Sequence, residues 1–167
     1  MRWVGVWVLV LAVAAGAEPV GARRVVSLNP SLTAMVIALG GRERLVGVDD
    51  YSARTPEAAG LPTVGGLYNP SLEAVVALAP DLVVLVPSAE QRGFRERLET
   101  LGIARLAFDP VSFDEVLAAI EQLGHAIGRD AAAASRIAAI RATRSRVEAA
   151  ARALPPLSGV LVLQRDP

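Results

Sequence analysis

Short apolar runs alternate with amphipathic segments from residue 24 onward. Aliphatic and β-branched residues gather at residues 25–28, 45–48, 82–86 and 104–108. Apolar residues at helical spacing occupy residues 30–39, 72–78, 90–101 and 113–127. Strands that alternate with helices favour an α/β fold with a parallel sheet. The run at residues 82–86 is apolar throughout, which predicts a central strand buried on both faces.

Polar residues mark where the predicted helices begin and end. Asn29-Pro30 opens the first helix, and Gly40-Gly41 ends it. Asn-Pro-Ser-Leu recurs at Asn69 and opens the next helix. Asparagine is a good N-cap and proline suits the first helical position, so capping alone accounts for both motifs. Ser112 and Glu115 have the spacing of a capping box. The helix after it is predicted to have a buried stripe of Phe113, Val116, Leu117, Ile120 and Ile127.

A long helix is predicted from Asp130, its cap, to about Leu154. Its roughly two dozen residues span on the order of 36 Å. Arginines at positions 136, 141, 144, 146 and 152 lie among alanines and indicate a solvated face. Pro155-Pro156 ends this helix, and an apolar run at residues 159–163 predicts a new strand. We therefore expect a second lobe beyond residue 167; the alternative is that the strand adds to the edge of the first sheet.

The composition allows one sizeable core. A chain of 167 residues with 53% hydrophobic residues is too short for two large domains. Seventeen basic residues balance 17 acidic ones, so no net field attracts nucleic acid or an anionic membrane. The absence of cysteine excludes disulfides, thiolate metal sites and a cysteine lipid anchor.

The first 17 residues are predicted to be a signal peptide. Arg2 precedes an apolar run at residues 3–14, and Ala15-Gly16-Ala17 forms a small-x-small cleavage site before Glu18. The run is shorter than the roughly 20 residues that cross a bilayer. We expect export to the periplasm as a soluble protein; an uncleaved anchor and a buried helix are the alternatives. Both tryptophans lie in this segment, so aromatic contacts in the mature chain depend on Tyr and Phe.

Three turns at the carboxyl ends of the predicted strands carry the candidate chemistry. They are Asn29-Pro30-Ser31, Asp49-Asp50-Tyr51 and Leu67-Tyr68-Asn69. Ligands of open parallel sheets bind at this edge. Backbone amides at the helix starts can bind an anionic or carbonyl-rich ligand. Tyr51 and Tyr68 can stack on a flat macrocycle or approach its metal, or they pack and face solvent instead.

Other polar residues give little support to catalysis or metal binding. Asp49 and Asp50 are adjacent and point opposite ways, so we interpret them as a solvated turn. His125, the single histidine, is interpreted as a helix residue at or near the surface. The chain lacks GxGxxG, a Walker motif and a nucleophile elbow. We expect no enzyme, although a cofactor-dependent enzyme and an interaction domain built on the Arg-rich helix are competing classes.

Several motifs in order carry a family resemblance. They are RVVSLNPS from Arg24, LVGV from Leu45, GGLYNPSLE from Gly65, ALAPDLV from Ala77 and LGI from Leu101, followed by the long helix. With them the chain resembles helical-backbone (class III) periplasmic solute-binding proteins of ABC importers for cobalamin, ferric siderophores and haem. The resemblance implies two Rossmann-like lobes joined by a rigid helix, with the ligand between them. Residues 18–128 then form the first lobe, 129–154 the connecting helix and 155–167 the start of the second lobe.

The resemblance also implies roles for residues. Asn29, Pro30, Ser31, Tyr51, Tyr68 and Asn69 would bind the ligand, and Glu73 would dock on the permease of a permease–ATPase complex. The alternative for Glu73 is a charge that only stabilises its helix start. The ligand is a transported metal chelate, with no prosthetic group, and a monomer is expected. Haem-binding members often have tyrosine directly after the Val-Gly pair, where this chain has Gly66; this disfavours haem and leaves corrinoid and ferric siderophore.

Overall fold

A four-stranded parallel sheet forms the centre of the structure, a computed structural model that describes residues 21–89, 92–155 and 158–159. Its strands lie in the order β2 (Leu45–Val48), β1 (Val25–Ser27), β5 (Leu82–Leu85) and β6 (Ala104–Ala107). All three pairings are parallel, which confirms the predicted α/β class. A separate antiparallel pair joins β3 (Gly65–Gly66) to β4 (Asn69–Pro70).

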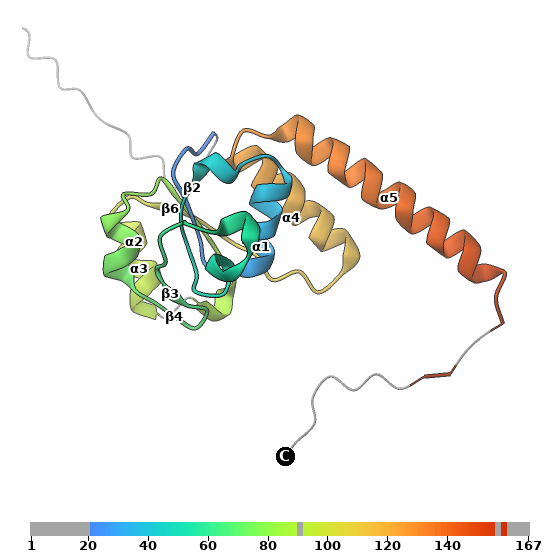
Figure 1. Cartoon of the computed structure of the whole chain (residues 1–167), viewed down its shortest axis with the longest axis horizontal. Coiled ribbons are helices and arrows are strands. Elements are labelled where there is room, and N and C mark those ends of the chain that lie inside the picture. Colours follow the sequence, from blue (N-terminus) through green and yellow to red (C-terminus); the bar gives the residue numbers. More distant parts are fainter. Residues whose placement is uncertain (1–20, 90–91, 156–157, 160–167) are drawn as a thin grey trace, which may run out of the picture.

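Helices cover both faces of the sheet. One face carries α1 (Pro30–Ala38) and α4 (Phe113–Ala126), and the other carries α2 (Leu72–Ala77) and α3 (Arg92–Thr100) (Figure 1). Val25 packs on the first side and Val26 on the second, as the alternation of a strand requires. Every residue of β5 is 0% exposed, which confirms that residues 82–85 form a strand buried on both faces.

The chain connections that follow the two central strands, β1 and β5, run in different directions. α1 follows β1 and α3 follows β5, and these helices lie on opposite faces of the sheet (Figure 1). The carboxyl ends of two neighbouring strands are therefore left open between the helices. In open α/β sheets, this is where ligands bind.

Of the four helix starts predicted with a cap residue, those at Asn29 and Ser112 are confirmed. Asn29 is the N-cap of α1, its Oδ1 accepts from Ser31 N at 2.9 Å, and Pro30 is at the first helical position. The capping box of Ser112 and Glu115 is complete. The expected helix start at Asn69 is wrong. Asn69 pairs with Gly66 in the hairpin, and Ser71 caps α2 through Ala74 N at 3.2 Å.

The long helix α5 (Asp130–Arg152) contains 23 residues. Ala133 and Ile137 are buried against α4, and a Cβ at Gly124 would lie only 2.5 Å from that of Ala133, so the two helices approach closely. Residues 141–152 are all exposed, and the helix extends away from the body of the molecule (Figure 1). The five arginines of α5 are exposed, as predicted.

The start of α5 differs slightly from expectation. Arg129 is the residue before the helix, and Asp130 is its first residue. His125 is exposed at the end of α4 and its Nδ1 lies 2.9 Å from Asp130 Oδ1, which agrees with its interpretation as a surface helix residue. This hydrogen bond lowers the pKa of the Asp130 carboxyl.

One prediction about the buried core is wrong. Phe113, expected in the buried stripe of its helix, is 38% exposed because it is the first residue of α4 and packs on Arg144 of α5. The predicted signal peptide and nearly all of the predicted strand at residues 159–163 lie outside the described residues. Among the described helices, none has the length and apolar character needed to cross a membrane.

Candidate functional site

Backbone hydrogen bonds join the three candidate turns at the carboxyl edge of the sheet. Asp49 N donates to Ser27 O at 3.0 Å, which links the ends of β2 and β1. Asp50 N donates to Gly65 O at 3.0 Å, which links the second turn to the β3–β4 hairpin. We call the surface formed by Asn29–Ser31, Asp49–Tyr51 and the hairpin residues 65–70 the loop face.

The turn after β1 uses its asparagine for helix capping. Asn29 Oδ1 is engaged by Ser31 N, so the side chain serves the fold whether or not it also meets a ligand. Pro30 is half-buried and lines a hollow of about 320 Å³ with Thr33 and Ser52. Ser31 is exposed and lines a second hollow, of about 250 Å³, between α1 and α5.

The turn after β2 is built around a buried carboxylate. Asp49 is 0% exposed; its Oδ1 accepts from Tyr51 N at 2.9 Å and from Ser52 N at 3.0 Å, and its Oδ2 accepts from the Ser52 hydroxyl. The interpretation of Asp49 as part of a solvated turn is therefore wrong, because backbone donors and a hydroxyl replace water around its oxygens.

Tyr51 stands outward on this turn. Its ring is 53% exposed, and the guanidinium carbon of Arg54 lies 5.2 Å from the ring centroid. Arg54 belongs to the short 3₁₀ helix Ser52–Arg54, whose first residue donates its backbone N–H to Asp49 Oδ1. A cation at this distance stabilises the ring electrostatically and places a positive charge beside it.

The hairpin places a second tyrosine on the loop face. Gly66 pairs with Asn69, so Leu67 and Tyr68 form the two-residue turn between the strands, and Tyr68 is 71% exposed. Gly65 has φ +104°, and a Cβ there would lie 3.0 Å from Asn69 O and 3.1 Å from Ser71 N. Only glycine meets both the backbone angle and the close contact. Gly65 is therefore required for the hairpin that exposes Tyr68 on the loop face.

Asn69 and Glu73 share a hollow at the side of the loop face. It measures about 440 Å³ and is also lined by Phe94 of α3. Glu73 is exposed in the first turn of α2, and the Ser71 hydroxyl donates to its Oε2 at 3.3 Å. The six expected ligand residues therefore lie on one edge of the sheet, and three of them, Pro30, Ser31 and Asn69, line three different hollows.

The chemistry of the loop face is that of stacking and hydrogen bonding. It presents two phenol rings, amide and hydroxyl groups, and the Arg54 guanidinium. Within the described residues, no group of three His, Cys, Asp or Glu side chains could hold a metal ion. Sequence reasoning missed Arg54 and the buried partners of Asp49. Arg54 follows Tyr51 by three residues and Ser52 follows Asp49 by three, so both spacings were usable signals, whereas Thr33, which contacts Ser52, comes from α1.

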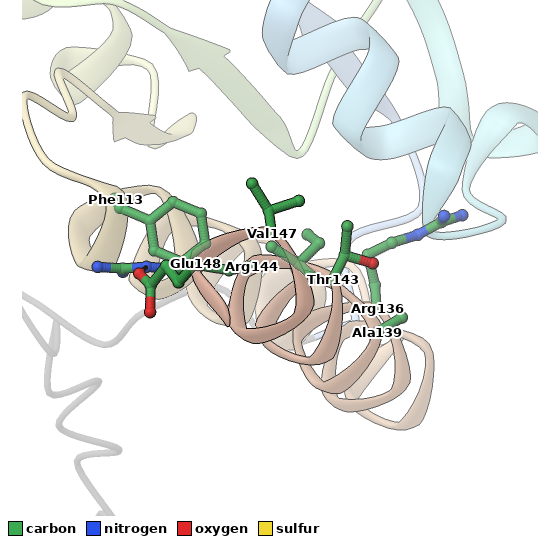
Figure 2. A pocket seen from close by; sticks show the side chains of 8 residues that line it. Phe113, Arg136, Ala139, Thr143, Arg144, Val147 and Glu148 are labelled. Atoms are coloured by element: carbon green, nitrogen blue, oxygen red, sulfur yellow. Dashed lines mark hydrogen bonds and ion pairs between the residues drawn. The ribbon is translucent and has the colours of Figure 1, made fainter. Parts of the chain in front are cut away.

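A further groove lies along the exposed part of α5. It measures about 480 Å³ and is lined by residues that include Ala139, Ile140 and Val147 (Figure 2). At one end the Arg144 guanidinium stacks 4.3 Å above the Phe113 ring and pairs with Glu148 at 2.7 Å. Figure 2 shows Thr143, Val147 and the Phe113 ring along this side of the helix. The groove lies apart from the tyrosines of the loop face.

Comparison with known proteins decides the family. A family model described as periplasmic binding protein matches residues 25–167. The chain belongs to the periplasmic binding protein family. The described part of the match contains the whole sheet, the loop face and α5.

Curated relatives of this periplasmic binding protein carry related names. The "Vitamin B12-binding protein" of Vibrio cholerae is 31% identical over 109 residues, which are 65% of this chain and 40% of the relative. The "Cobalamin-binding protein" of Halobacterium salinarum is 37% identical over 148 residues, 86% of this chain and 38% of the relative. The chain therefore spans about two fifths of the length of these relatives.

Solved periplasmic binding proteins share the fold. A periplasmic haem-binding protein of Pseudomonas aeruginosa matches with a TM-score of 0.71 and 27% identity over 80% of this chain and 50% of that structure. The periplasmic vitamin B12-binding protein of Vibrio cholerae matches with a TM-score of 0.69 and 26% identity over 77% of this chain and 50% of that structure. The match confirms the Rossmann-like lobe that the motifs predicted.

Proposed function

We propose that this chain supplies one wall of the ligand cleft of a periplasmic binding protein that delivers a corrinoid to an ABC importer. The observation that carries the proposal is the pair of exposed rings, Tyr51 and Tyr68, on hydrogen-bonded loops at the carboxyl edge of the sheet. Two aromatic rings left in water at a ligand-binding edge favour a ligand with a broad apolar face. A second lobe would supply the opposite wall.

Two observations favour a corrinoid over other chelates. The relatives at 31% and 37% identity are named for vitamin B12 and cobalamin. A corrinoid has a wide ring that an aromatic side chain can stack against and a rim of amides that hydrogen-bond to polar side chains. The loop face offers Tyr51 and Tyr68 for the first contact and Ser31 and Asn69, both exposed, for the second. The chelate keeps its own metal ligands, so the protein needs no metal cluster.

Haem is the second candidate. The Pseudomonas aeruginosa structure at a TM-score of 0.71 is a haem-binding protein, and a tyrosine phenol is a suitable iron ligand. In this chain the hairpin places Tyr68 at the turn, two positions after Gly66, and Gly66 lies in β3. Tyr68 is thus the residue of the hairpin that would meet the iron if haem were the ligand.

Glu73 is proposed to contact the permease. It is exposed on the side of the loop face, and the Ser71 hydroxyl restrains its carboxylate at 3.3 Å. Exposed ion pairs add little to folding but can set the orientation and rate of docking. We place the partner arginines on the membrane permease, as the family resemblance implies.

We propose the remaining features from the family resemblance and from the sequence of residues 1–17. Residues 1–17 direct export, and the mature chain works in the periplasm as a monomer. The protein binds and releases its ligand without catalysing a reaction on it. The ATPase of the importer, rather than this chain, supplies the energy for transport.

The proposal is tested by titrating the full-length protein with cyanocobalamin and haemin and following visible absorbance. We expect saturable binding of cyanocobalamin that weakens about fivefold or more in Tyr68→Ala and in Tyr51→Ala, because a stacked ring contributes upwards of about 1 kcal/mol. Leu101→Ala is the control, since Leu101 is exposed beyond the end of α3. Equal cyanocobalamin affinity in all three variants would show that neither tyrosine contacts the ligand. Binding of haemin alone would select the second candidate.

A further inference from the structure

The buried polar side chains of the described residues form one connected cluster. They are Ser27, Thr33, Asp49 and Ser52, each 2% exposed or less. They come from β1, α1 and the turn after β2, and they lie directly beneath two of the three turns of the loop face. We call this group the hydroxyl cluster.

The contacts of the hydroxyl cluster run from one turn to the other. Ser52 donates to the Asp49 carboxylate, and Ser52 Oγ lies 2.9 Å from Thr33 Oγ1. Thr33 Oγ1 also lies 2.8 Å from Ser27 Oγ, and its one hydrogen can be donated to Ser27 or to Ser52. The Ser27 hydroxyl lies 3.4 Å from the Asn29 carbonyl that it faces. A continuous path therefore joins the Asn29 turn to the Tyr51 turn.

Hydrogen bonds beneath the two turns can fix the orientation of the turns, which apolar packing does not do. Apolar side chains would fill the same space, but their attraction has no preferred direction. A hydrogen bond holds its partners at a set distance and angle. In a low-dielectric interior, the hydrogen bonds of a cluster also strengthen one another. The cluster thus fixes how the Tyr51 turn is oriented relative to α1 and to the Asn29 turn.

We propose that Thr33, Asp49 and Ser52 are positioning residues that hold the Asn29 and Tyr51 turns as a single rigid ligand surface. All three are buried, so they act through the residues above them rather than by touching the ligand. Asp49 orients the backbone of Tyr51 and Ser52, and Thr33 ties that turn to α1. This inference rests on the proposed function for its effect on affinity, but its effect on the loops is independent of any ligand.

The experiment uses the full-length protein with Thr33→Val, which keeps the shape and removes the hydroxyl, and Thr33→Ser, which restores it. Thr100→Val is the matched control, because Thr100 donates to Glu96 O at 2.7 Å on the exposed surface of α3. Amide hydrogen exchange of residues 50–55 is measured without ligand. Cyanocobalamin affinity is then measured alone and in the Tyr51→Ala background.

We expect Thr33→Val to speed exchange at residues 50–55 by about tenfold while residues 82–85 stay protected. Affinity should fall about fivefold in Thr33→Val and recover within twofold in Thr33→Ser. With Tyr51 already replaced by alanine, Thr33→Val should change affinity by less than twofold, because its effect passes through that ring. Ser52→Ala should reproduce the pattern if Thr33→Val does not fold.

The outcomes separate this inference from the proposed function. Faster exchange at residues 50–55 in a protein that binds no chelate would support the positioning role and reject the proposed ligand. Unchanged exchange at residues 50–55 would overturn the positioning role even if cyanocobalamin binds. A uniform loss of protection across the sheet with unchanged affinity would also overturn it, because the cluster would then serve stability alone.

Discussion

The two Asn-Pro-Ser-Leu segments have the same four residues and different structures. In residues 29–32, Asn29 caps α1 and Pro30 is its first residue. In residues 69–72, Asn69 and Pro70 form β4, and Ser71 caps α2 two residues later. Each motif contains two competent N-caps, and each segment uses a different one.

The residues that precede each motif explain the difference. Leu28 is fully buried at the end of β1, and its N–H donates to Val84 O at 2.9 Å, so the chain leaves the sheet immediately before Asn29. Gly65 and Gly66 instead begin a hairpin, and its return strand requires Asn69 and Pro70 to be extended. Local sequence therefore provides the cap, and the pairing of preceding residues selects which one is used.

The largest expected effect is that of Gly65→Ala, which removes the cause of the difference. The substitution forces a side chain into φ +104° and against Asn69 O at 3.0 Å. We expect a loss of about 2 kcal/mol in the free energy of unfolding, measured by urea denaturation, together with weaker chelate binding through Tyr68. Gly66→Ala is the control, since a Cβ there meets no atom within 4 Å. Equal losses for the two variants would show that the hairpin does not depend on Gly65.

Replacing the asparagine of each motif with alanine should lower stability more in the first motif than in the second. The difference should be smaller than that between the two glycine variants. Asn29→Ala removes the acceptor of Ser31 N, and the free energy of unfolding should fall by about 1 kcal/mol. Asn69→Ala changes an exposed residue of β4 that caps no helix, and we expect a change within about 0.5 kcal/mol. Thermal unfolding of both variants measures the difference. A larger loss for Asn69→Ala would reverse the assignment of caps.

Replacing the serine of each motif with alanine should lower stability more in the second motif than in the first, and by somewhat less than the asparagine substitution does. Ser71→Ala removes the hydroxyl that accepts from Ala74 N at 3.2 Å, and a loss of about 0.7 kcal/mol is expected. Ser31→Ala keeps the backbone N–H that Asn29 uses, so the free energy of unfolding should hardly change. Urea denaturation of the pair provides the measurement, and identical midpoints would mean that Ser71 is not the effective cap.

The smallest effect on stability is expected at Glu73, the residue that follows the second motif. The first motif is followed there by Thr33, which is buried in the hydroxyl cluster, whereas Glu73 is exposed. Glu73→Ala should change the free energy of unfolding by less than about 0.5 kcal/mol and leave chelate affinity intact. Uptake driven by the reconstituted importer should decrease. Normal uptake would limit Glu73 to a charge at a helix start.

Features with a local cause were predictable from the sequence. The apolar run at residues 82–86 sufficed to predict a central strand, and Ser112 with Glu115 sufficed to predict the capping box. Asp49 was misjudged because its partners Ser52 and, through it, Thr33 are brought together by the turn and by packing on α1. The contact of Phe113 with Arg144 likewise joins residues 31 positions apart in the chain.

The hydroxyl cluster was not predicted from the sequence, because its members come from separate segments of the chain. Each hydroxyl residue alone has an ordinary place: Ser27 at a strand end, Thr33 in a helix and Ser52 in a turn. Their proximity follows from the order β2-β1 and from the crossing of α1 over these strands. Tyr51 and Tyr68 could be named as ligand candidates because rings at strand ends are unusual on a solvated edge, and that role stays a proposal.

The stiffness of α5 turns a small angle into a large displacement. At 1.5 Å per residue its 23 residues measure about 34 Å, and a tilt of about 5° at the first turn moves the far end by about 3 Å. Two contacts that restrain this angle lie near its beginning: the close approach of Gly124 to Ala133 and the ion pair between Arg129 and Glu43. A methyl group added at Gly124, which would lie 2.5 Å from the Ala133 Cβ, would push on α5 at its start, where a small tilt is translated into the largest displacement at Arg152.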